Sequence, residues 1–261
     1  MEKVYGLHAV RALLLRHAER VQAVTLVEGR GDTRGDARVA EIQSLAQKAG
    51  KPVKRAPAPT FRQLFGDAVH QGVFAEVQPL APWREEDLVA GITARLEARG
   101  PAPLVLVLDG VQDPHNLGAC LRTADACGAL AVVIPKDRAV QMNATVRKVA
   151  AGAAETTPLA VVTNLSRTLK LLKDAGLWIV GADAEAPKLA HETDLNGPIA
   201  LVMGAEGAGL RQLTRENCDY LVRLPQAGAV ESLNVSVATG MLLYEALRQR
   251  LVVNRGPQLN P

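Results

Sequence analysis

Three short segments of the chain carry side chains that could bind and orient a reacting ligand. The first holds Asn116 and Arg122, the second Glu206, and the third Ser232 and Asn234. Amide, carboxylate and hydroxyl groups can orient a substrate hydroxyl, and a guanidinium can hold a phosphate or a developing negative charge. Each segment follows an apolar run typical of a buried strand. Ligands of open α/β sheets bind beyond the carboxyl ends of strands, so these segments are candidates for a binding site.

The first segment, "LVLVLDGVQDPHNLGACLR", predicts a strand, a turn and a helix. Asn116 is expected to cap that helix. Gly118 lies four residues before Arg122 and so on the same helix face. Helical side chains lean toward the N-terminus, which predicts that Arg122 reaches across Gly118 toward Asn116. The alternative is an ion pair between Arg122 and an acid such as Asp125 on a solvated face.

The second segment, "IALVMGAEGAGL", predicts a strand that opens into a glycine-rich loop. Gly204, Gly207 and Gly209 would permit positive φ angles and a close approach of backbone N–H groups to a ligand. Glu206 inside this loop favours a polar ligand or a helix-capping contact. The loop matches neither G-x-G-x-x-G nor G-x-x-x-x-G-K-[ST]. A nucleotide-dependent small-molecule enzyme is therefore disfavoured.

The third segment, "LPQAGAVESLNVSVATG", leaves a strand and enters a long helix expected to start near Asn234. Ser232 and Asn234 are both natural N-cap residues, and capping alone would explain either of them. One cap would suffice, however. The second polar side chain, next to Glu231, is therefore expected to serve another purpose.

The elements that must position these segments form a mostly parallel sheet between helices. Apolar runs without alternation indicate strands that are covered on both faces. The expected strands span residues 104–110, 130–135, 158–162, 177–182, 198–204 and 219–225. The long helix at residues 234–252 closes this half of the chain.

The first part of the chain predicts a separate, small α/β domain. Helical spacing is seen at residues 6–17, 37–51 and 60–66, and short strands are expected at residues 21–29, 52–56 and 71–78. The proline-rich stretch that follows predicts a linker with one helix. We therefore expect a small first domain at residues 1–80, a linker at 81–102 and a larger second domain at 103–261.

Charge is distributed unevenly between these parts. The 261 residues carry a net charge of +3, with 48% hydrophobic and 22% charged residues, which excludes disorder as the main character. Residues 1–80 hold 12 Lys and Arg against 8 Asp and Glu, whereas residues 101–261 hold 15 of each. A basic bias on a separate module fits contact with phosphates, although a solvated surface explains it equally well. The candidate phosphate contacts are Lys51, Lys54, Arg55 and Arg62.

The three cysteines predict neither a zinc site nor a disulfide framework. Cys120, Cys127 and Cys218 form no C-x-x-C pair, and the first two are expected on one helix as small buried side chains. No apolar run reaches about 18 residues and no signal peptide is recognisable. We expect a cytoplasmic protein without a metal or a membrane segment.

Together, the three segments resemble the SpoU family of RNA ribose 2′-O-methyltransferases. The resemblance rests on Asn116 through Arg122, then on Gly204-x-Glu206-x-x-Gly209-Leu210, and then on Glu231-Ser232-Leu233-Asn234-Val235-Ser236. It extends to the first domain through "YGLHAVRALL" and "HQGVFAEV", and so covers nearly the whole chain. One departure is Gln226, where the family pattern has a methionine after the proline.

The resemblance implies S-adenosylmethionine as methyl donor, a trefoil knot in the catalytic domain and a homodimer whose catalytic centre lies near the subunit interface. It favours a guanosine of 23S rRNA as the substrate. It places the adenosyl group against the backbone of Gly204, Leu224 and Leu233.

By the same resemblance, Arg122 acts on the ribose, and the other polar residues orient it, the ribose and the donor. The family mechanism makes the matching arginine a base assisted by a substrate phosphate. Arginine keeps its proton to a pH above about 12, and a phosphate would hold that proton more tightly. We therefore expect Arg122 to clamp the substrate and stabilise charge. Asn116, Glu206, Ser232 and Asn234 complete the expected catalytic group.

Two further alternatives remain open at the level of the sequence. A tRNA ribose methyltransferase of the same family is one, although the separate first domain disfavours the minimal tRNA type. A non-catalytic RNA-binding protein on the same fold is the other. The presence of all five polar side chains speaks against it.

Overall fold

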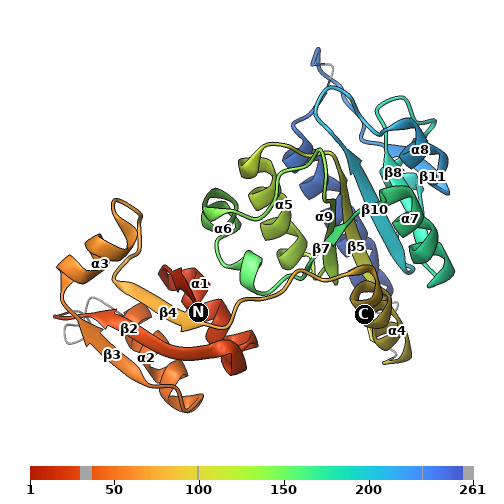
Figure 1. The fold of residues 1–261 in the computed structure, drawn as a ribbon. Helices are drawn as coiled ribbons and strands as arrows, with labels where there is room; N and C mark the ends of the chain where they lie inside the picture. The colour runs from red at the N-terminus through yellow and green to blue at the C-terminus, as the bar shows by residue number, and fades with distance from the viewer. Residues whose placement is uncertain (30–36, 99, 231, 255–261) are drawn as a thin grey trace, which may run out of the picture. The chain divides into compact units, whose positions relative to one another are not determined.

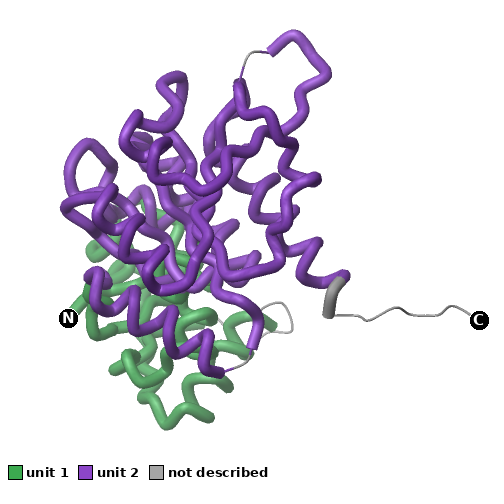
Figure 2. Tube along the Cα trace, turned by 90° about the vertical axis from the view of Figure 1, so that its right-hand side faces the viewer, with its two compact units in different colours: residues 1–81, 151–156 green, residues 82–150, 157–261 purple. Residues whose placement is uncertain are grey.

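The computed structural model describes residues 1–29, 37–98, 100–230 and 232–254, and it divides into two compact units. Unit 1 comprises residues 1–81 and 151–156, and unit 2 comprises residues 82–150 and 157–261 (Figure 2). Within these described ranges, no helix is both long enough and apolar enough to cross a bilayer.

Unit 1 contains a four-stranded sheet in the order β1-β4-β2-β3. Strand β4 runs antiparallel to β1 and β2, and β3 runs parallel to β2. The strands are β1 (Glu2–Tyr5), β2 (Val21–Val27), β3 (Val53–Ala56) and β4 (Val73–Val77). Three of these were predicted; β1 was not. The helices are α1 (Leu7–Arg16), α2 (Ala37–Lys48) and α3 (Ala58–Phe65), with η1 (Ala18–Arg20) before β2.

The core of unit 1 lies between the sheet and the helices α1 and α2, which contribute Leu13 and Ile42. An aromatic cluster joins α3 to the sheet. Its rings belong to Tyr5, Phe61, Phe65, His70 and Phe74. All three phenylalanines of the chain are therefore used in this small unit.

A segment from the middle of the chain also belongs to unit 1. Within it, η2 (Ala153–Glu155) packs against α1. Glu155 is buried and accepts a hydrogen bond from the Arg20 guanidinium at 3.2 Å, and a second Arg20 nitrogen donates to the Glu155 carbonyl at 3.1 Å. Nothing in the local sequence predicted this pair, because 135 residues separate its members.

Unit 2 contains a seven-stranded sheet in which every pair is parallel, in the order β7-β6-β5-β10-β8-β11-β9. The strands are β5 (Leu104–Asp109), β6 (Ala131–Pro135), β7 (Leu159–Val162), β8 (Trp178–Ala182), β9 (Lys188–Leu189), β10 (Ile199–Gly204) and β11 (Tyr220–Arg223). The six apolar runs without alternation are all strands of this sheet, as predicted. The two-residue edge strand β9 was not predicted.

Helices cover both faces of this sheet (Figure 1). The helices are α4 (Glu85–Glu97), α5 (Pro114–Ala126), α6 (Ala144–Ala150), α7 (Leu165–Asp174), α8 (Gln212–Glu216) and α9 (Val235–Asn254), with η3 (Ala190–Glu192) after β9. Helices α4 and α7 pack on one face, and α5 and α9 pack against each other and on the other face. The expected α/β sandwich is confirmed.

The segment expected to be a linker belongs in large part to unit 2. Leu88 and Ile92 of α4 are buried in the same core as the strands β5 and β6. Glu85 at the start of α4 also bonds to Thr168 of α7, at 2.6 Å. The helix expected in this stretch is therefore present, and it covers the sheet as part of unit 2.

Gly118 has a different purpose from the one expected. A Cβ at this position would lie 2.7 Å from Val149 Cβ and 2.9 Å from the Val146 carbonyl oxygen, both on α6. The missing side chain therefore permits α6 to approach α5, rather than clearing a path for Arg122. This distance could not be derived from helical spacing alone.

The cysteines are free thiols, as expected. Burial raises the pKa of Cys120 to about 11 and that of Cys218 to about 12. Burial also raises the pKa of Cys127, which lies at the end of α5. A raised pKa disfavours the thiolate, which is the nucleophilic form of cysteine. Among the described residues, no group of three His, Cys, Asp or Glu side chains could hold a metal ion.

The α5–α6 packing yields a test with a matched control. Gly118→Ala should lower the free energy of unfolding by about 1–2 kcal/mol, because overpacking outweighs the gain in helix propensity. Gly240 also lies within a helix, α9, but a Cβ there would meet only Thr123 Cγ2 at 3.7 Å. Gly240→Ala should therefore leave stability unchanged or raise it by up to about 1 kcal/mol. Urea unfolding measures both variants, and equal behaviour of the two would contradict this account.

Candidate active site

The parallel sheet brings the three segments to one edge. Because all strands run in one direction, their carboxyl ends meet there. Gly204 at the end of β10 pairs in register with Asp109 at the end of β5. Strands β6 and β7 continue the sheet on one side of β5, and β10 and β8 on the other. The segments therefore lie at a switch point of the sheet, where α/β proteins bind ligands.

One hydrogen-bonded group joins the three segments. Glu206 Oε1 accepts from Asn116 Nδ2 at 3.1 Å and from Asn234 Nδ2 at 2.5 Å. Asn234 Nδ2 also donates to Asn116 Oδ1 at 3.0 Å. Asn116 is only 6% exposed, so its amide depends on these partners. Three of the five predicted polar residues thus contact one another across 90 and 118 residues of sequence.

The helix caps differ in part from the prediction. Asp113, not Asn116, caps α5, since its carboxylate accepts from the His115 backbone N–H at 2.9 Å. Asn116 lies within the helix and turns toward Glu206. Asn234 caps α9, because its Oδ1 accepts from the backbone N–H groups of the next turn, including that of Ser236 at 2.9 Å. Its amide nitrogen remains free to bind Glu206.

The glycine-rich loop that carries Glu206 folds back on itself. Ala205 and Gly209 exchange two backbone hydrogen bonds, at 3.1 and 2.9 Å. A Cβ at Gly204 would lie 2.1 Å from the Gly209 carbonyl carbon. Gly204 was expected to let a ligand approach its backbone closely. In the structure, the space next to Gly204 is occupied by the backbone of Gly209 in the same loop. Gly207 and Gly209 have the expected positive φ angles, 73° and 65°.

Sequence reasoning missed the ion pair that fixes the far end of this loop. Asp109 is 1% exposed, and its carboxylate accepts from the backbone N–H of Arg211 at 3.1 Å and from Arg211 Nε at 2.5 Å. The pair connects the end of β5 to the residues that follow the glycine-rich loop. The only available signal was an aspartate at the end of an apolar strand, and it did not indicate its partner.

A cavity of about 380 Å³ opens beside this group. Its lining is largely apolar and comes from the ends of β8, β10 and β11 and from the start of α9. The predicted residues that line it are Gly204, Glu206, Leu224, Ser232 and Leu233. Gln226, the departure from the family pattern, also lines it. Asn116 and Asn234 do not line the cavity but are hydrogen-bonded to Glu206, which does. Glu231 falls outside the described residues.

Arg122 lies on α5, six residues after Asn116, and is exposed. Among the described residues it makes no hydrogen bond or ion pair, so the alternative pairing with Asp125 is not seen. Asp125 instead accepts from the Thr157 hydroxyl at 3.2 Å. Arg122 is thus an uncompensated cation available to an external anion.

Comparison with known proteins defines the class. Residues 103–244 match the model of the SpoU rRNA Methylase family, and residues 3–83 match that of the RNA 2′-O ribose methyltransferase substrate-binding domain. The chain belongs to the SpoU rRNA methylase family.

Relatives at high identity share nearly the full length of the chain. A 23S rRNA (guanosine-2′-O-)-methyltransferase RlmB of Pseudomonas aeruginosa is 55% identical, over 95% of this chain and 97% of its own length. The RlmB of Escherichia coli K12 is 49% identical, over 95% and 99%. The AdoMet-bound rRNA methyltransferase from Sinorhizobium meliloti has 25% identity and a TM-score of 0.68, over 94% of this chain and 86% of its own.

The Asp109–Arg211 pair yields a second test. Arg211→Ala would leave a fully buried carboxylate without its cation, although the arginine side chain is 45% exposed. We expect a loss of about 1–3 kcal/mol in the free energy of unfolding at pH 7. Arg11→Ala breaks the exposed pair with Glu41 and should cost less than about 1 kcal/mol.

The double variant Asp109→Asn, Arg211→Ala should recover part of this loss, because it removes the unpaired charge. Denaturant titration of the three variants and the wild type measures these differences. A cost for Arg211→Ala no larger than that for Arg11→Ala would contradict the assigned role of the pair.

Proposed function

We propose that this protein transfers a methyl group from S-adenosylmethionine to the ribose 2′-hydroxyl of a guanosine in 23S rRNA. The observation that carries the proposal is the contact of Asn116, Glu206 and Asn234 beside an apolar cavity. The names of the near-full-length relatives support the rRNA substrate. The proposed substrate implies action in the cytoplasm, on ribosomal RNA.

The cavity suits the proposed methyl donor. Its volume falls in the range of small-ligand sites, and its largely apolar lining includes Gly204, Leu224 and Leu233, the residues proposed to contact the donor through their backbone. The apolar residues would hold the adenosyl group, and the backbone would supply hydrogen bonds to it. When bound, S-adenosylmethionine supplies an electrophilic methyl group. The S. meliloti relative, which was crystallised with AdoMet, supports this assignment.

The chain's own residues would orient the reacting ribose. Glu206 already accepts from Asn116 and Asn234, so its position is fixed before any substrate binds. Such preorganisation lowers the cost of aligning a hydroxyl with the donor. Ser232 lines the cavity beside Glu206 and has a hydroxyl to offer. Arg122 would hold a phosphate of the substrate and stabilise charge that develops on the ribose oxygen.

Residues 1–80 would bind RNA outside the catalytic centre, and the second domain would contain the trefoil knot of the family. Two of the four basic residues considered as phosphate contacts in the first domain already have partners within the protein. Lys54 bonds to Glu76 at 3.3 Å, and Arg55 bonds to Gln43 at 3.4 Å. Arg62 is exposed on α3 and has no partner among the described residues, which favours it as a phosphate contact.

The function is tested by incubating the purified protein with methyl-labelled S-adenosylmethionine and, separately, 23S rRNA and tRNA. Label should appear in 23S rRNA at one ribose, and Arg122→Ala should reduce it at least about 100-fold by removing transition-state stabilisation. Arg122→Ala should keep the wild-type melting temperature and donor affinity, since the side chain is exposed and unpaired. Label in tRNA alone, or near-normal turnover of Arg122→Ala, would overturn the respective assignment.

We further propose a homodimer, in which α9 contributes to the interface. Val237, Met241 and Tyr244 follow the helical spacing i, i+4, i+7 and are 52%, 46% and 62% exposed. Such an apolar stripe on a water-exposed helix marks an interaction surface. It begins one turn after Asn234, so a partner subunit seated there would lie beside the catalytic residues.

The dimer is tested by placing charge in this stripe. Met241→Glu with Tyr244→Glu should convert the protein to a monomer in size-exclusion chromatography with light scattering, because buried carboxylates are costly. The control Glu245→Gln changes a neighbouring side chain that is bonded to Arg248 of the same helix. It should leave the dimer intact. A wild-type protein that is monomeric at micromolar concentration would contradict the proposal.

A further inference from the structure

The catalytic unit carries a cluster of cations that the proposed mechanism does not use. Residues 136–148 contain four Lys and Arg side chains and one carboxylate, a net charge of +3. Residues 101–261 are neutral as a whole, so the remainder of this part of the chain is net negative. This short segment therefore carries a net positive charge, whereas the rest of the catalytic domain carries a net negative one.

Three of these cations are free to bind a ligand. Lys136, Arg138 and Lys148 are exposed, and none of them makes an ion pair within the described part of the chain. Unlike Lys54 and Arg20, they have no carboxylate partner to displace. The three residues are called the basic ridge below.

The loop that carries Lys136 and Arg138 of the basic ridge is held by hydrogen bonds from one side chain. Gln141 Nε2 donates to the carbonyl oxygens of Pro135 and Lys136, each at 3.1 Å, and of Ala139 at 3.3 Å. Arg138 has a φ of 58°, a left-handed conformation that is uncommon for a residue with a side chain. A fixed loop loses little conformational entropy on binding, which suits a preformed contact surface.

The same loop adjoins the mouth of the candidate site. The backbone N–H of Val140 donates to the Val111 carbonyl at 2.9 Å, and the Arg138 carbonyl lies 3.7 Å from where a Cβ on Gly110 would be. Val111 and Gly110 directly follow Asp109, at the end of β5. The basic ridge therefore flanks the turn that leads to Asn116.

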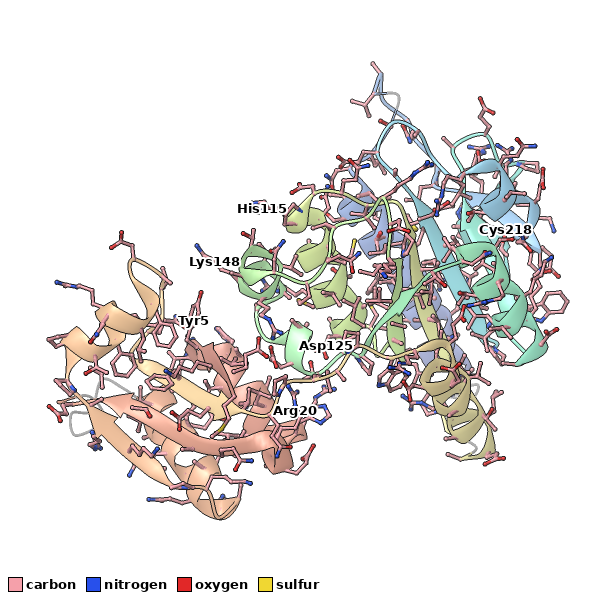
Figure 3. The ribbon with its side chains drawn as sticks, viewed as in Figure 1. Tyr5, Arg20, His115, Asp125, Lys148 and Cys218 are labelled. Atoms are coloured by element: carbon pink, nitrogen blue, oxygen red, sulfur yellow. The ribbon has the colours of Figure 1, made fainter. Side chains whose placement is uncertain are left out.

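Helix α6 carries the third cation of the basic ridge, Lys148, and packs against α5. Val149 contacts the Gly118 position, so Lys148 belongs to the helix that packs on the one bearing Arg122. Figure 3 shows Lys148 and His115 on the outer side of this helix pair. Cations thus continue from the β6–α6 loop to the helix of the catalytic arginine.

We propose that the basic ridge binds the RNA backbone next to the nucleotide whose ribose is methylated. The inference rests on the proposed function. Spaced, unpaired Lys and Arg side chains favour a chain of phosphates over a single small anion, and phosphate contacts fix the register of a nucleic acid without reading its bases. The basic ridge would hold the strand while Arg122 acts on one ribose.

The test measures binding of a 23S rRNA transcript as a function of salt. The triple variant Lys136→Gln, Arg138→Asn, Lys148→Gln removes three cations, and asparagine tolerates the left-handed backbone at residue 138. The slope of log affinity against log salt should fall by about 2–3, and affinity should weaken at least about tenfold. The KM for RNA should rise more than kcat falls, while S-adenosylmethionine affinity and melting temperature stay at wild-type values.

A matched pair of single variants distinguishes the effect of a cation's position on RNA binding from the effect of losing one positive charge. Lys148→Gln on α6 should weaken RNA binding, whereas Lys170→Gln on α7, which packs on the other face of the sheet, should not. Equal losses for the two, or an unchanged salt slope in the triple variant, would overturn the basic ridge as an RNA site. Methylation of 23S rRNA by the wild-type protein is scored in the same assay. Its absence would count against the proposed function, independently of the ridge.

Discussion

The carboxylate of Glu206 is the point on which the candidate site depends. One of its oxygens accepts from the side chains of Asn116 and Asn234 and, at 3.4 Å, from the backbone N–H of Val235. These donors belong to the first turns of α5 and α9, which lie far apart in the sequence. A negative charge held by several donors is stable where a lone carboxylate or amide would be costly. These hydrogen bonds fix the glycine-rich loop, the starts of α5 and α9 and this part of the cavity wall relative to one another.

This arrangement is possible because the sheet is parallel throughout. The strands deliver their carboxyl ends to one edge, and the Asp109–Arg211 pair and the backbone bonds between Ala205 and Gly209 then fold the glycine-rich loop over that edge. Asn234 uses its two amide atoms separately, the oxygen to cap α9 and the nitrogen to bind Glu206. Secondary structure and site therefore share the same side chains, which limits the substitutions that either can accept.

The basic side chains of the two units differ in whether they already have partners within the protein. Several basic side chains of the first unit already have partners, as the Lys54–Glu76 bond shows. In the catalytic unit, Arg122 and the basic ridge are exposed without ion pairs among the described residues. An unpaired cation gives its full attraction to an incoming phosphate, because no internal partner must first be released. Charge counted along the sequence therefore misses where attraction is strongest, since opposite charges cancel over the catalytic unit as a whole.

The sequence by itself determined the local features. Apolar runs without alternation predicted the main strands of the parallel sheet, and residue types near strand ends predicted the polar site. These follow from chemistry that acts over a few residues. Only the tertiary structure decided the pairings. It showed that Asp113 rather than Asn116 caps α5, that Gly118 admits α6, and that Asp109 binds Arg211. The last two contacts join segments that are about 30 and 100 residues apart, so no local pattern encodes them. The cap is local, and it was missed because Asp113 and Asn116 are both natural N-cap residues.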